Sequence, residues 1–367
     1  MRMKVAVIGT RGFPGIQGGV EVHSENLYPR MQDVEITVYR RKPYLTEQSQ
    51  RFFPGITYVD LPSTRIKGLE ALLHTLLAAI HCIFTRPDVV HVHNMGPGLF
   101  APLLRLAGLR VVMTYHSANY EHAKWNAWQR RLLRLCEHVS LRSSHRVIFV
   151  NRFQMQKYDA RIQAKSVSIP NGINSYSRTE ATDFLSRHGI EPGSYLLAVG
   201  RLTPEKGFEH LVSAVQGMPQ VKQVVIAGAA DHNPAYLSTL RTLDVARKVV
   251  FTGFTTGLDL CQLYSHARLY VLPSLAEGFP MVMLEAMSYG LPLAVSDLPA
   301  TRLVPLDDGC YFPPADEAAM SGVIASRLNQ PAVPVVYDLT PYNWPDIARR
   351  TRQVYQMAMQ RGNEDKK

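Results

Sequence analysis

Short runs of β-branched and other apolar residues recur along this chain and alternate with longer stretches of helical spacing. One series begins at residue 4 and ends near residue 170, and a second begins near residue 194. Gly, Pro or Asn bounds the runs, which is typical of buried strands in parallel sheets that helices cover on both faces. The pattern predicts an α/β protein with two Rossmann-like, doubly wound domains that face a cleft and bind ligands at the carboxyl ends of their strands.

The polar, turn-rich segment NGINSYSRTEATD separates the two series and predicts a domain junction near residues 171–180. We expect one domain over residues 1–172 and a second over residues 181–342, since 367 residues suffice for about two domains. A helix over residues 343–360 is expected to follow. Asn343 is its candidate N-cap, with Pro345 in the first turn.

Composition narrows the class of protein. Hydrophobic residues make up 46% of the chain, so each domain can bury a core, yet no run of 18 apolar residues predicts a membrane span. The N-terminus enters a strand-like run at once and lacks the apolar core of a signal peptide. The four cysteines have no CxxC or CxH spacing. We therefore expect reduced thiols, no zinc site and a cytoplasmic location.

Positive charge is concentrated in the first half. Residues 1–175 contain 23 Lys and Arg against 11 Asp and Glu, giving +12, whereas the remainder contains 17 against 19, giving −2. The first domain should therefore face an anionic partner, such as nucleic acid, an acidic membrane leaflet or a phosphorylated substrate. No RNP, zinc-finger or KH-type signature supports nucleic acid, so we expect none.

The first expected strand leads into the glycine-rich loop GTRGFPGIQGGVEVHSENL. Gly18 and Gly19 open a helix whose free N–H groups are able to meet a phosphate. The alternative is a flexible loop with no ligand. The loop is not G-x-G-x-x-G, and the second strand ends in the basic VYRRK instead of an acidic residue. A dinucleotide site and hydride transfer are therefore disfavoured.

Three histidines lie at or near strand ends. His116 follows a strand directly, where a neutral imidazole can donate to a sugar hydroxyl; the alternative is a structural histidine, and the residues leave both open. His91 and His93 share one face of another strand. No third ligand is evident near this H-x-H, so packing and hydrogen bonding are favoured over a metal site.

Two cations follow the first strand of the second series, in LLAVGRLTPEKGFEHLV. Arg201 and Lys206 come after Gly200 and precede a helix. Two positive charges beside a helix N-terminus make a site for a diphosphate that needs no metal. The alternative is a solvated loop with two surface charges, which the strand–Gly–Arg–loop–Lys–Gly context weakens.

Two carboxylates interrupt the otherwise apolar segment EGFPMVMLEAMSYG. Glu277 lies on the loop before a helix that has Pro280 in its first turn and Gly290 at its end, and Glu285 lies inside that helix. A buried carboxylate must be paired or hydrogen-bonded, and carboxylates suit vicinal hydroxyls. One acid can hold a sugar and the other a ribose, with the Gly278 and Phe279 amides between them. The alternative is one exposed acid and one salt-bridged acid.

These segments resemble those of one enzyme family. EGFPMVMLEAMSYGLPLAVSD is similar to the E-x7-E segment of glycosyltransferase family 4, whose members are retaining enzymes with the GT-B fold. VGRLTPEKGFEHLV resembles the family's Arg…Lys segment, and IPNGIN resembles its interdomain junction. The glycine-rich loop and YNWPDIARRTRQVY resemble elements of a bacterial branch that builds cell-surface polysaccharides. The resemblance covers essentially the whole chain.

The resemblance implies a role for each candidate residue. Glu285 binds the ribose of a nucleotide, while Glu277 and the Gly278 and Phe279 amides hold donor-sugar hydroxyls. Arg201 and Lys206 neutralise the diphosphate leaving group. His116 touches the donor sugar near the reacting carbon, the Gly18–Gly19 loop closes on the phosphates or the acceptor, and the last helix crosses back to brace the first domain.

The resemblance also implies a mechanism. The expected enzyme is a hexosyltransferase that takes a sugar from a nucleotide-diphosphate donor with retention of configuration and no cofactor. No D-x-D occurs in the chain, which fits transfer without a metal. The expected acceptor is a polyprenyl-diphosphate-linked saccharide of exopolysaccharide, capsule or O-antigen assembly.

Two segments of the first domain bear on location. RIKGLEALLHTLLAAIHCIFTR and KWNAWQRRLLRLCEHVSLR read as basic helices with an apolar face. Such helices either lie on the anionic inner face of the plasma membrane or simply pack on the sheet, and the residues leave both open.

Two other functions compete with transfer. A GT-B sugar-nucleotide epimerase would isomerise the donor without an acceptor, and the E-x7-E pattern argues against it. An inactive nucleotide- or glycan-binding module should lack one of Arg201, Lys206, Glu277 or Glu285, and all four are present.

Overall fold

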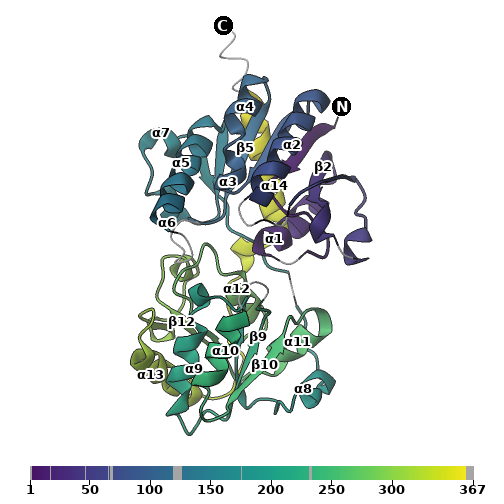
Figure 1. Ribbon diagram of the computed structural model, residues 1–367. Helices are drawn as coiled ribbons and strands as arrows, with labels where there is room; N and C mark the ends of the chain where they lie inside the picture. The colour runs from purple at the N-terminus through teal and green to yellow at the C-terminus, as the bar shows by residue number, and fades with distance from the viewer. Residues whose placement is uncertain are drawn as a thin grey trace. The chain divides into compact units, whose positions relative to one another are not determined.

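The computed structural model describes residues 2–16, 18–45, 47–64, 66, 69–118, 126–174, 176–230 and 234–360. The chain divides into two compact units. The first consists of Met1–Gly172 and Pro341–Lys367, and the second is Ile173–Thr340. Each unit is built on one sheet, and every strand pair in the described residues is parallel (Figure 1).

The first unit has a seven-stranded sheet in the order β3-β2-β1-β4-β5-β6-β7. Its strands are β1 (Met3–Ile8), β2 (Val34–Arg41), β3 (Ile56–Leu61), β4 (Val89–His93), β5 (Arg110–Tyr115), β6 (Arg146–Phe149) and β7 (Ser166–Ser168). The order changes direction between β1 and β4, so the carboxyl ends of these neighbouring strands form the crevice where α/β sheets bind ligands.

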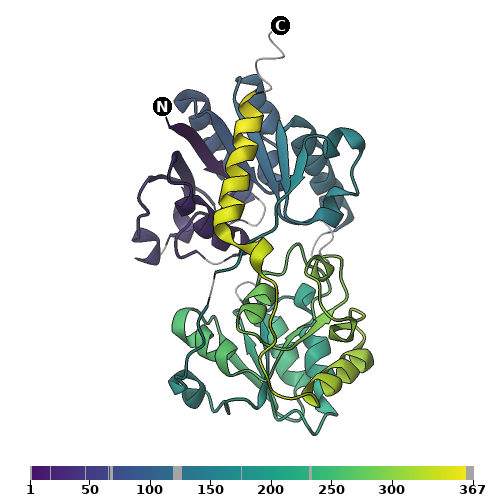
Figure 2. The ribbon, with the colours of Figure 1, turned by 180° about the vertical axis from the view of Figure 1, so that it is seen from behind.

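Helices cover both faces of this sheet. They are α1 (Gly19–Leu27), α2 (Leu69–Thr85), α3 (Met95–Gly98), α4 (Ala101–Leu106), α5 (Ala127–Ser143), α6 (Arg152–Met155), α7 (Ala160–Gln163) and α14 (Trp344–Gln360). Figure 1 shows α2 to α5 in front of the sheet, and Figure 2 shows α14 running across its back. Val7, Val90 and Val112 are fully buried on central strands, as strands covered on both faces require.

The final helix belongs to the first unit although it follows the second in the chain. Asn343 caps it: its side-chain oxygen accepts from the Asp346 amide at 2.9 Å, so the expected N-cap is confirmed. Tyr355 on its buried face bonds His91 Nδ1 of β4 at 2.7 Å. Arg350 donates to the Ser168 carbonyl of β7 at 2.6 Å, so the helix is tied to the sheet at two places.

The second unit has a six-stranded sheet in the order β10-β9-β8-β11-β12-β13. Its strands are β8 (Tyr195–Val199), β9 (Gln223–Ala227), β10 (Val249–Gly253), β11 (Leu269–Leu272), β12 (Leu293–Ser296) and β13 (Tyr311–Phe312). Its helices are α8 (Asp183–Arg187), α9 (Phe208–Gln216), α10 (Pro234–Leu243), α11 (Gly257–His266), α12 (Met281–Ser288) and α13 (Glu317–Leu328). One core cluster of this unit joins residues of β8, β9 and β11 to residues of α9, α10 and α13.

The structure confirms the expected fold class, two parallel sheets each covered by helices. Every strand expected from the apolar runs forms. The edge strand β13 was not expected, because its two residues are too short to show a period. Among the described residues, no helix has the length and apolar character needed to cross a membrane.

Candidate active site

The loop after β8 carries the two predicted cations of the second unit. Arg201 lies two residues beyond the strand, and Lys206 ends a short 3₁₀ turn, Pro204–Lys206, before α9 begins at Phe208. Arg201 is exposed and forms no ion pair with any residue that the structure describes. Lys206 is largely buried, with 18% of its side chain exposed. Both cations therefore lie at the carboxyl end of the sheet.

Lys206 and Glu277 form an ion pair. Glu277 follows β11, the strand beside β8, and its Oε1 lies 2.6 Å from Lys206 Nζ. Ser274 Oγ donates to the same oxygen at 2.7 Å, and only 8% of the Glu277 side chain is exposed. The pair joins loops that are 71 residues apart in sequence. Each charge is therefore held in a fixed place by the other before any ligand arrives.

The loop after Glu277 leads into α12. Phe279 is buried, and its carbonyl accepts from the Met281 amide at 3.0 Å. The helix begins at Met281, so Pro280 occupies the N-cap instead of the expected first turn. Gly290 lies beyond the last turn with φ +69°, as expected of a residue that ends a helix. Gly278 and Phe279 thus stand between the two acids, as the sequence indicated.

Glu285 is partly buried on α12, and Tyr264 of α11 donates a hydrogen bond to its Oε2 at 2.9 Å. Removal from water raises the pKa of this carboxyl to about 7, and the bond from Tyr264 opposes that rise. Glu285 forms no salt bridge with any residue that the structure describes, and neither acid is a solvated surface group. This excludes the simple alternative of one exposed and one salt-bridged acid.

The glycine-rich loop of the first unit ends at α1. Gly18 is the N-cap with φ +148°, and Gly19 is the first helical residue. Glu21 in the first turn accepts from the Arg11 amide at 2.9 Å, and Glu25 accepts from the Gly15 amide at 3.3 Å. Two carboxylates of α1 thus fold the loop back onto its own helix. The role of Gly18 and Gly19 toward a ligand stays a prediction.

His116 lies at the end of β5, as expected, and it belongs to a cluster of rings. Its Nε2 is 2.9 Å from His93 Nδ1, at the end of the neighbouring strand β4. His23 of α1 stands edge-on to His116, with ring centroids 5.0 Å apart. Burial lowers the pKa of all three imidazoles, so each ring is neutral at pH 7.

His91 and His93 are both buried and hydrogen-bonded. Tyr28 Oη lies 2.8 Å from His91 Nδ1 and 2.6 Å from His93 Nε2, and His91 Nε2 lies 2.7 Å from Thr114 Oγ1. The expectation that no further ligand lies near this H-x-H was wrong, because tertiary packing brings His23 and His116 to His93. These residues come from segments far apart in sequence, so no local pattern shows their proximity.

Sequence reasoning also missed several partners of the candidate residues. Ser274 supports Glu277, Tyr264 supports Glu285, and Asn171 Oδ1 lies 2.8 Å from His23 Nδ1. Only Asn171 lies in a segment that the sequence had singled out. Each of the others is a common residue type on an ordinary helix or loop, so only the tertiary contact marks it.

Comparisons with known proteins agree with this architecture. Residues 17–175 match the family model Glycosyltransferase Family 4, and residues 193–330 match the model Glycosyl transferases group 1. A glycosyltransferase of Methanocaldococcus jannaschii, described as uncharacterized, is 29% identical over 98% of this chain and 99% of its own length. O-antigen chain mannosyltransferase B of Escherichia coli is 27% identical over 64% of each chain.

Two solved structures have the same fold. Sucrose-phosphate synthase from Thermosynechococcus elongatus superposes with a TM-score of 0.83 at 21% identity, covering 97% of this chain and 99% of the other. HepE of Anabaena, solved with UDP and glucose, gives a TM-score of 0.71 at 18% identity over 100% and 99% of the two chains. The two family models together span most of the chain. The protein is therefore a glycosyltransferase of the GT-B fold, with a family 4 domain followed by a group 1 domain.

Proposed function

We propose that this glycosyltransferase moves a hexose, with retention of configuration, from a nucleotide-diphosphate sugar to a lipid-linked saccharide. The observation that carries the proposal is the Lys206–Glu277 pair, which holds a cation and an anion 2.6 Å apart at the carboxyl ends of neighbouring strands. A nucleotide-diphosphate sugar offers matching groups side by side, since a diphosphate needs cations and a sugar's hydroxyls suit a carboxylate.

In the proposed donor complex, Lys206 and the exposed Arg201 neutralise the diphosphate. Glu277 accepts hydrogen bonds from sugar hydroxyls, with the Gly278 and Phe279 amides as further donors. Glu285 is assigned to the nucleotide ribose. The solved complex of HepE with UDP and glucose supports a donor of this class, because that protein has the same fold.

The proposed catalysis is mainly electrostatic and needs no cofactor. The bond between the sugar's anomeric carbon and the β-phosphate oxygen breaks, and its electron pair stays on the phosphate beside Arg201 and Lys206. The acceptor hydroxyl attacks from the same face, and its proton passes to the leaving phosphate oxygen. His116 contacts the donor sugar through Nδ1, because its Nε2 faces His93. Glu277 is held by Lys206 and Ser274 and is assigned to binding, not to nucleophilic attack.

Nucleotide binding tests the diphosphate site. UDP, GDP, ADP and dTDP are each added to wild type, Lys206→Ala and Lys222→Ala, and thermal unfolding is followed. Lys222 is the matched control, because it pairs with Glu191 at 3.6 Å on the surface of the same unit. At 100 times its Kd a nucleotide stabilises the folded state by about 2.7 kcal/mol.

We expect one nucleotide to shift wild type and Lys222→Ala equally and Lys206→Ala weakly. The ligand-induced shift is compared, not the melting temperature itself, because Lys206→Ala also leaves Glu277 without its counter-charge. A folded wild type that responds to none of the four nucleotides would refute the proposed site. NMR of the matching donor sugar without acceptor then distinguishes transfer from epimerisation, which alone changes the free donor.

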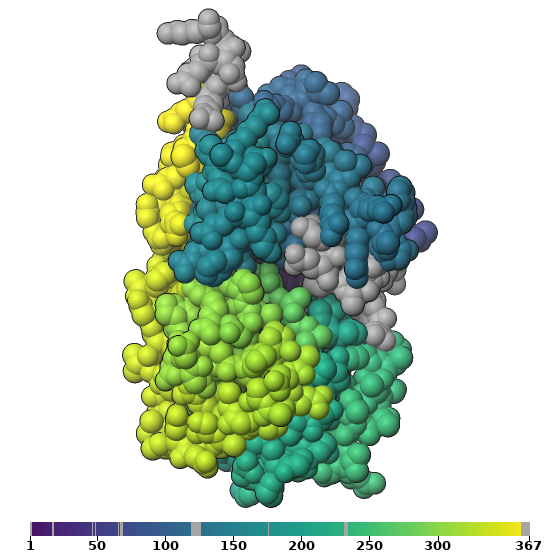
Figure 3. Space-filling model, turned by 90° about the vertical axis from the view of Figure 1, so that its left-hand side faces the viewer, coloured from purple at the N-terminus to yellow at the C-terminus, as the bar shows by residue number. Residues whose placement is uncertain are grey.

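The surface of the first unit supports a lipid-linked acceptor. Large apolar side chains are exposed along one face of α2, at Leu69, Leu73, Leu76, Ile80 and Phe84. Exposed apolar residues continue on α4, which contacts both α2 and α5, and on α5. Figure 3 shows the teal segments that include α5 at the surface on one side of this unit.

The charges on these helices suit an anionic lipid surface. Arg131 and Arg134 are exposed on α5 beside Trp128, Leu132 and Leu135. Glu137, the acid of this helix, is buried and accepts from Tyr115 and Tyr158. Basic and apolar side chains without an exposed acid are the composition of interfacial helices. We propose that this face lies on the inner leaflet, where a polyprenyl-linked acceptor would be held. The O-antigen relative is consistent with such an acceptor.

Vesicle flotation tests the membrane proposal. Phe84→Glu with Trp128→Glu removes side chains that are 81% and 70% exposed, so folding should be little affected. We expect binding to anionic vesicles to fall by roughly tenfold or more, because burying one such side chain is worth about 2 kcal/mol. Leu258→Glu with Val245→Glu is the control, on residues 79% and 83% exposed in the second unit. Equal loss in both double variants, or no vesicle binding by wild type, would contradict the proposal.

A further inference from the structure

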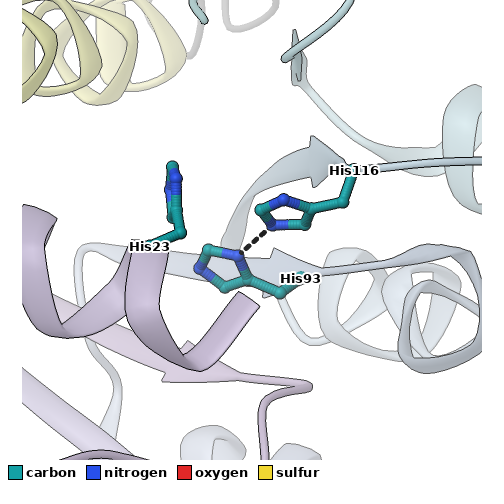
Figure 4. A group of neighbouring side chains, drawn as sticks. All are labelled: His23, His93 and His116. Carbon is teal, nitrogen blue, oxygen red and sulfur yellow. Dashed lines mark hydrogen bonds between the residues drawn. The ribbon is translucent and has the colours of Figure 1, made fainter. Parts of the chain in front are cut away.

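Three histidines of the first unit converge at the carboxyl ends of its central strands. His23 comes from α1, His93 ends β4, and His116 follows β5. The rings of His93 and His116 are stacked and His23 stands edge-on to both (Figure 4), with centroids 5.0 to 5.8 Å apart. One ring nitrogen from each lies within 4.8 Å of the other two. Three imidazoles are a ligand set that Zn²⁺ and similar transition metals prefer.

His23 offers a ligand atom that nothing else uses. Its side chain is 4% exposed, and its buried Nε2 has no hydrogen-bond partner among the described residues. A buried polar atom without a partner is unfavourable in a native structure, so it points to a missing ligand. The other nitrogen, Nδ1, lies 2.8 Å from Asn171 Oδ1. With Nδ1 carrying the proton for that bond, Nε2 keeps a lone pair that a ligand can use.

His93 is oriented in the same way by a second residue. Its Nε2 lies 2.6 Å from Tyr28 Oη, which leaves Nδ1 facing His116. Metal-binding histidines generally bond an oxygen through their other nitrogen, which fixes the ring and its tautomer. Asn171 and Tyr28 occupy those positions for His23 and His93.

We propose that His23, His93 and His116 bind one divalent transition-metal ion of the Zn²⁺ class through one ring nitrogen each. His116 is only half-buried, so the ion has an entry path and an open fourth position for water or an anion on that side. The cluster contains no carboxylate, which disfavours Mg²⁺ and Ca²⁺ because these ions take oxygen ligands. This site replaces the sequence-based expectation of no metal.

The rearrangement needed is small. Zn–N bonds of about 2.0–2.1 Å at tetrahedral angles place ligand nitrogens roughly 3.4 Å apart. His93 Nδ1 and His116 Nε2 are 2.9 Å apart, so their mutual hydrogen bond opens by about half an ångström and the shared proton leaves. His23 moves inward to complete the set. The ion then links α1 to β4 and β5.

A bound ion would also act on the proposed transfer, since binding through Nε2 shifts the His116 ring, whose Nδ1 contacts the donor sugar in that proposal. This consequence rests on the proposed function, whereas the site itself does not. We expect a chelator to leave transfer unaffected, because in the proposal Arg201 and Lys206, and not a metal, neutralise the diphosphate. We expect Zn²⁺ to inhibit transfer, because the bound ion shifts His116.

Direct metal binding tests the site. Untagged, metal-stripped protein is titrated with Zn²⁺ against a chromophoric chelator and, separately, with Co²⁺ while visible absorption is recorded. We expect one ion per chain and the intense absorption of four-coordinate Co²⁺. His23→Ala and His93→Ala should each weaken Zn²⁺ binding by at least about tenfold, and Asn171→Ala by roughly ten- to a hundredfold through loss of ring orientation. His138→Ala, on the exposed face of α5, is the matched control and should bind as wild type does.

The results separate the site from the enzyme's function. Wild type that binds no Zn²⁺, or whose binding is the same in His23→Ala, His93→Ala and His138→Ala, overturns the metal site and leaves the proposed function untouched. The weak absorption of six-coordinate Co²⁺ in wild type would also overturn the metal site. This test uses wild type alone, so it does not depend on any variant folding. Stoichiometric binding that His23→Ala abolishes supports the site. If transfer then continues unchanged with Zn²⁺ bound, the contact of His116 with the donor is wrong and the metal site stands.

Discussion

Glu285 has a pKa near neutrality and should make donor binding depend on pH. Its carboxyl has a pKa of about 7 in the folded protein. A protonated carboxyl must release its proton before it can accept from two ribose hydroxyls. We therefore expect nucleotide-sugar affinity to rise roughly tenfold between pH 6 and pH 8, since the ionised fraction of a group with a pKa of about 7 rises by that factor over this range. Calorimetric titration at several pH values measures it, and Glu285→Gln should bind more weakly with a flat profile.

The raised pKa of Glu285 also determines whether the stability of the folded protein rises or falls with pH. The folded pKa is raised from the ordinary value of 4.5, so the folded state binds this proton more tightly than the unfolded chain does. Stability from this group therefore falls as pH rises from about 4.5 through 7. Ligand-free Glu285→Gln should be relatively more stable than wild type at pH 8 than at pH 5. A Glu285→Gln profile as steep as wild type would show that another group is titrating.

Substitution of Tyr264 tests whether the pKa of Glu285 controls donor binding. Its hydroxyl donates to Glu285 Oε2 and lowers the carboxyl's pKa, so Tyr264→Phe should raise that pKa further. The pH midpoint of donor binding should move upward while affinity at pH 9 approaches that of wild type. A merely structural role for Tyr264 would weaken binding equally at every pH.

At the scale of elements, the loop between β8 and α9 depends on one glycine. Gly207 has φ +62°, and a Cβ on it would lie 2.2 Å from the Pro273 carbonyl oxygen at the end of β11. In the same loop, the Glu205 carbonyl accepts a hydrogen bond from the Leu275 amide at 2.9 Å. The loop that carries Lys206 is thus pressed against the loop that carries Glu277, which is how their charges meet.

We predict that Gly207→Ala destabilises the protein by about 3 kcal/mol and weakens nucleotide binding, because strain at positive φ adds to a clash with backbone. Gly193→Ala is the control, since Gly193 has φ +75° and open space where its Cβ would lie. It should lose only about 1 kcal/mol, from the strain alone, and bind nucleotide normally. Urea unfolding measures both. Equal losses of stability in the two variants would mean that the contact with Pro273 has no energetic role.

At the scale of the molecule, the first unit is discontinuous, because residues 341–367 complete it after the second unit. Trp344, Ile347, Val354 and Tyr355 of α14 are all buried. Trp344 packs directly on Gly172, where an added Cβ would lie 2.5 Å from its ring. A fragment of residues 1–172 would expose the surfaces that these side chains cover.

We predict that residues 173–340 fold alone with cooperative thermal unfolding, and that residues 1–172 do not. A short Gly-Ser linker should restore the first unit when it joins residue 172 to residues 341–360, because Gly172 and Trp344 are in contact. Circular dichroism and thermal melts of the three fragments measure this. A fragment 1–172 as stable as the linked one would show that α14 is dispensable for folding.

The sequence by itself determined the element types, their order and the fold class. Buried parallel strands leave continuous apolar runs, and helices keep their own period and caps, so local pattern is enough to find them. It also placed Arg201, Lys206 and Glu277 on loops that follow strands and Glu285 inside a helix, because those motifs are contiguous. It missed β13, which is too short to carry a period.

Only the tertiary structure decided which distant groups meet. The Lys206–Glu277 pair, the Tyr264–Glu285 bond and the convergence of His23 with His93 and His116 join segments that are 71, 21 and up to 93 residues apart. Contacts of this kind depend on strand order and on how loops pack at one end of a sheet, and neither follows from a residue's neighbours in sequence. The raised pKa of Glu285 likewise comes from burial in the folded chain, which is why the chemistry of these sites needed the structure.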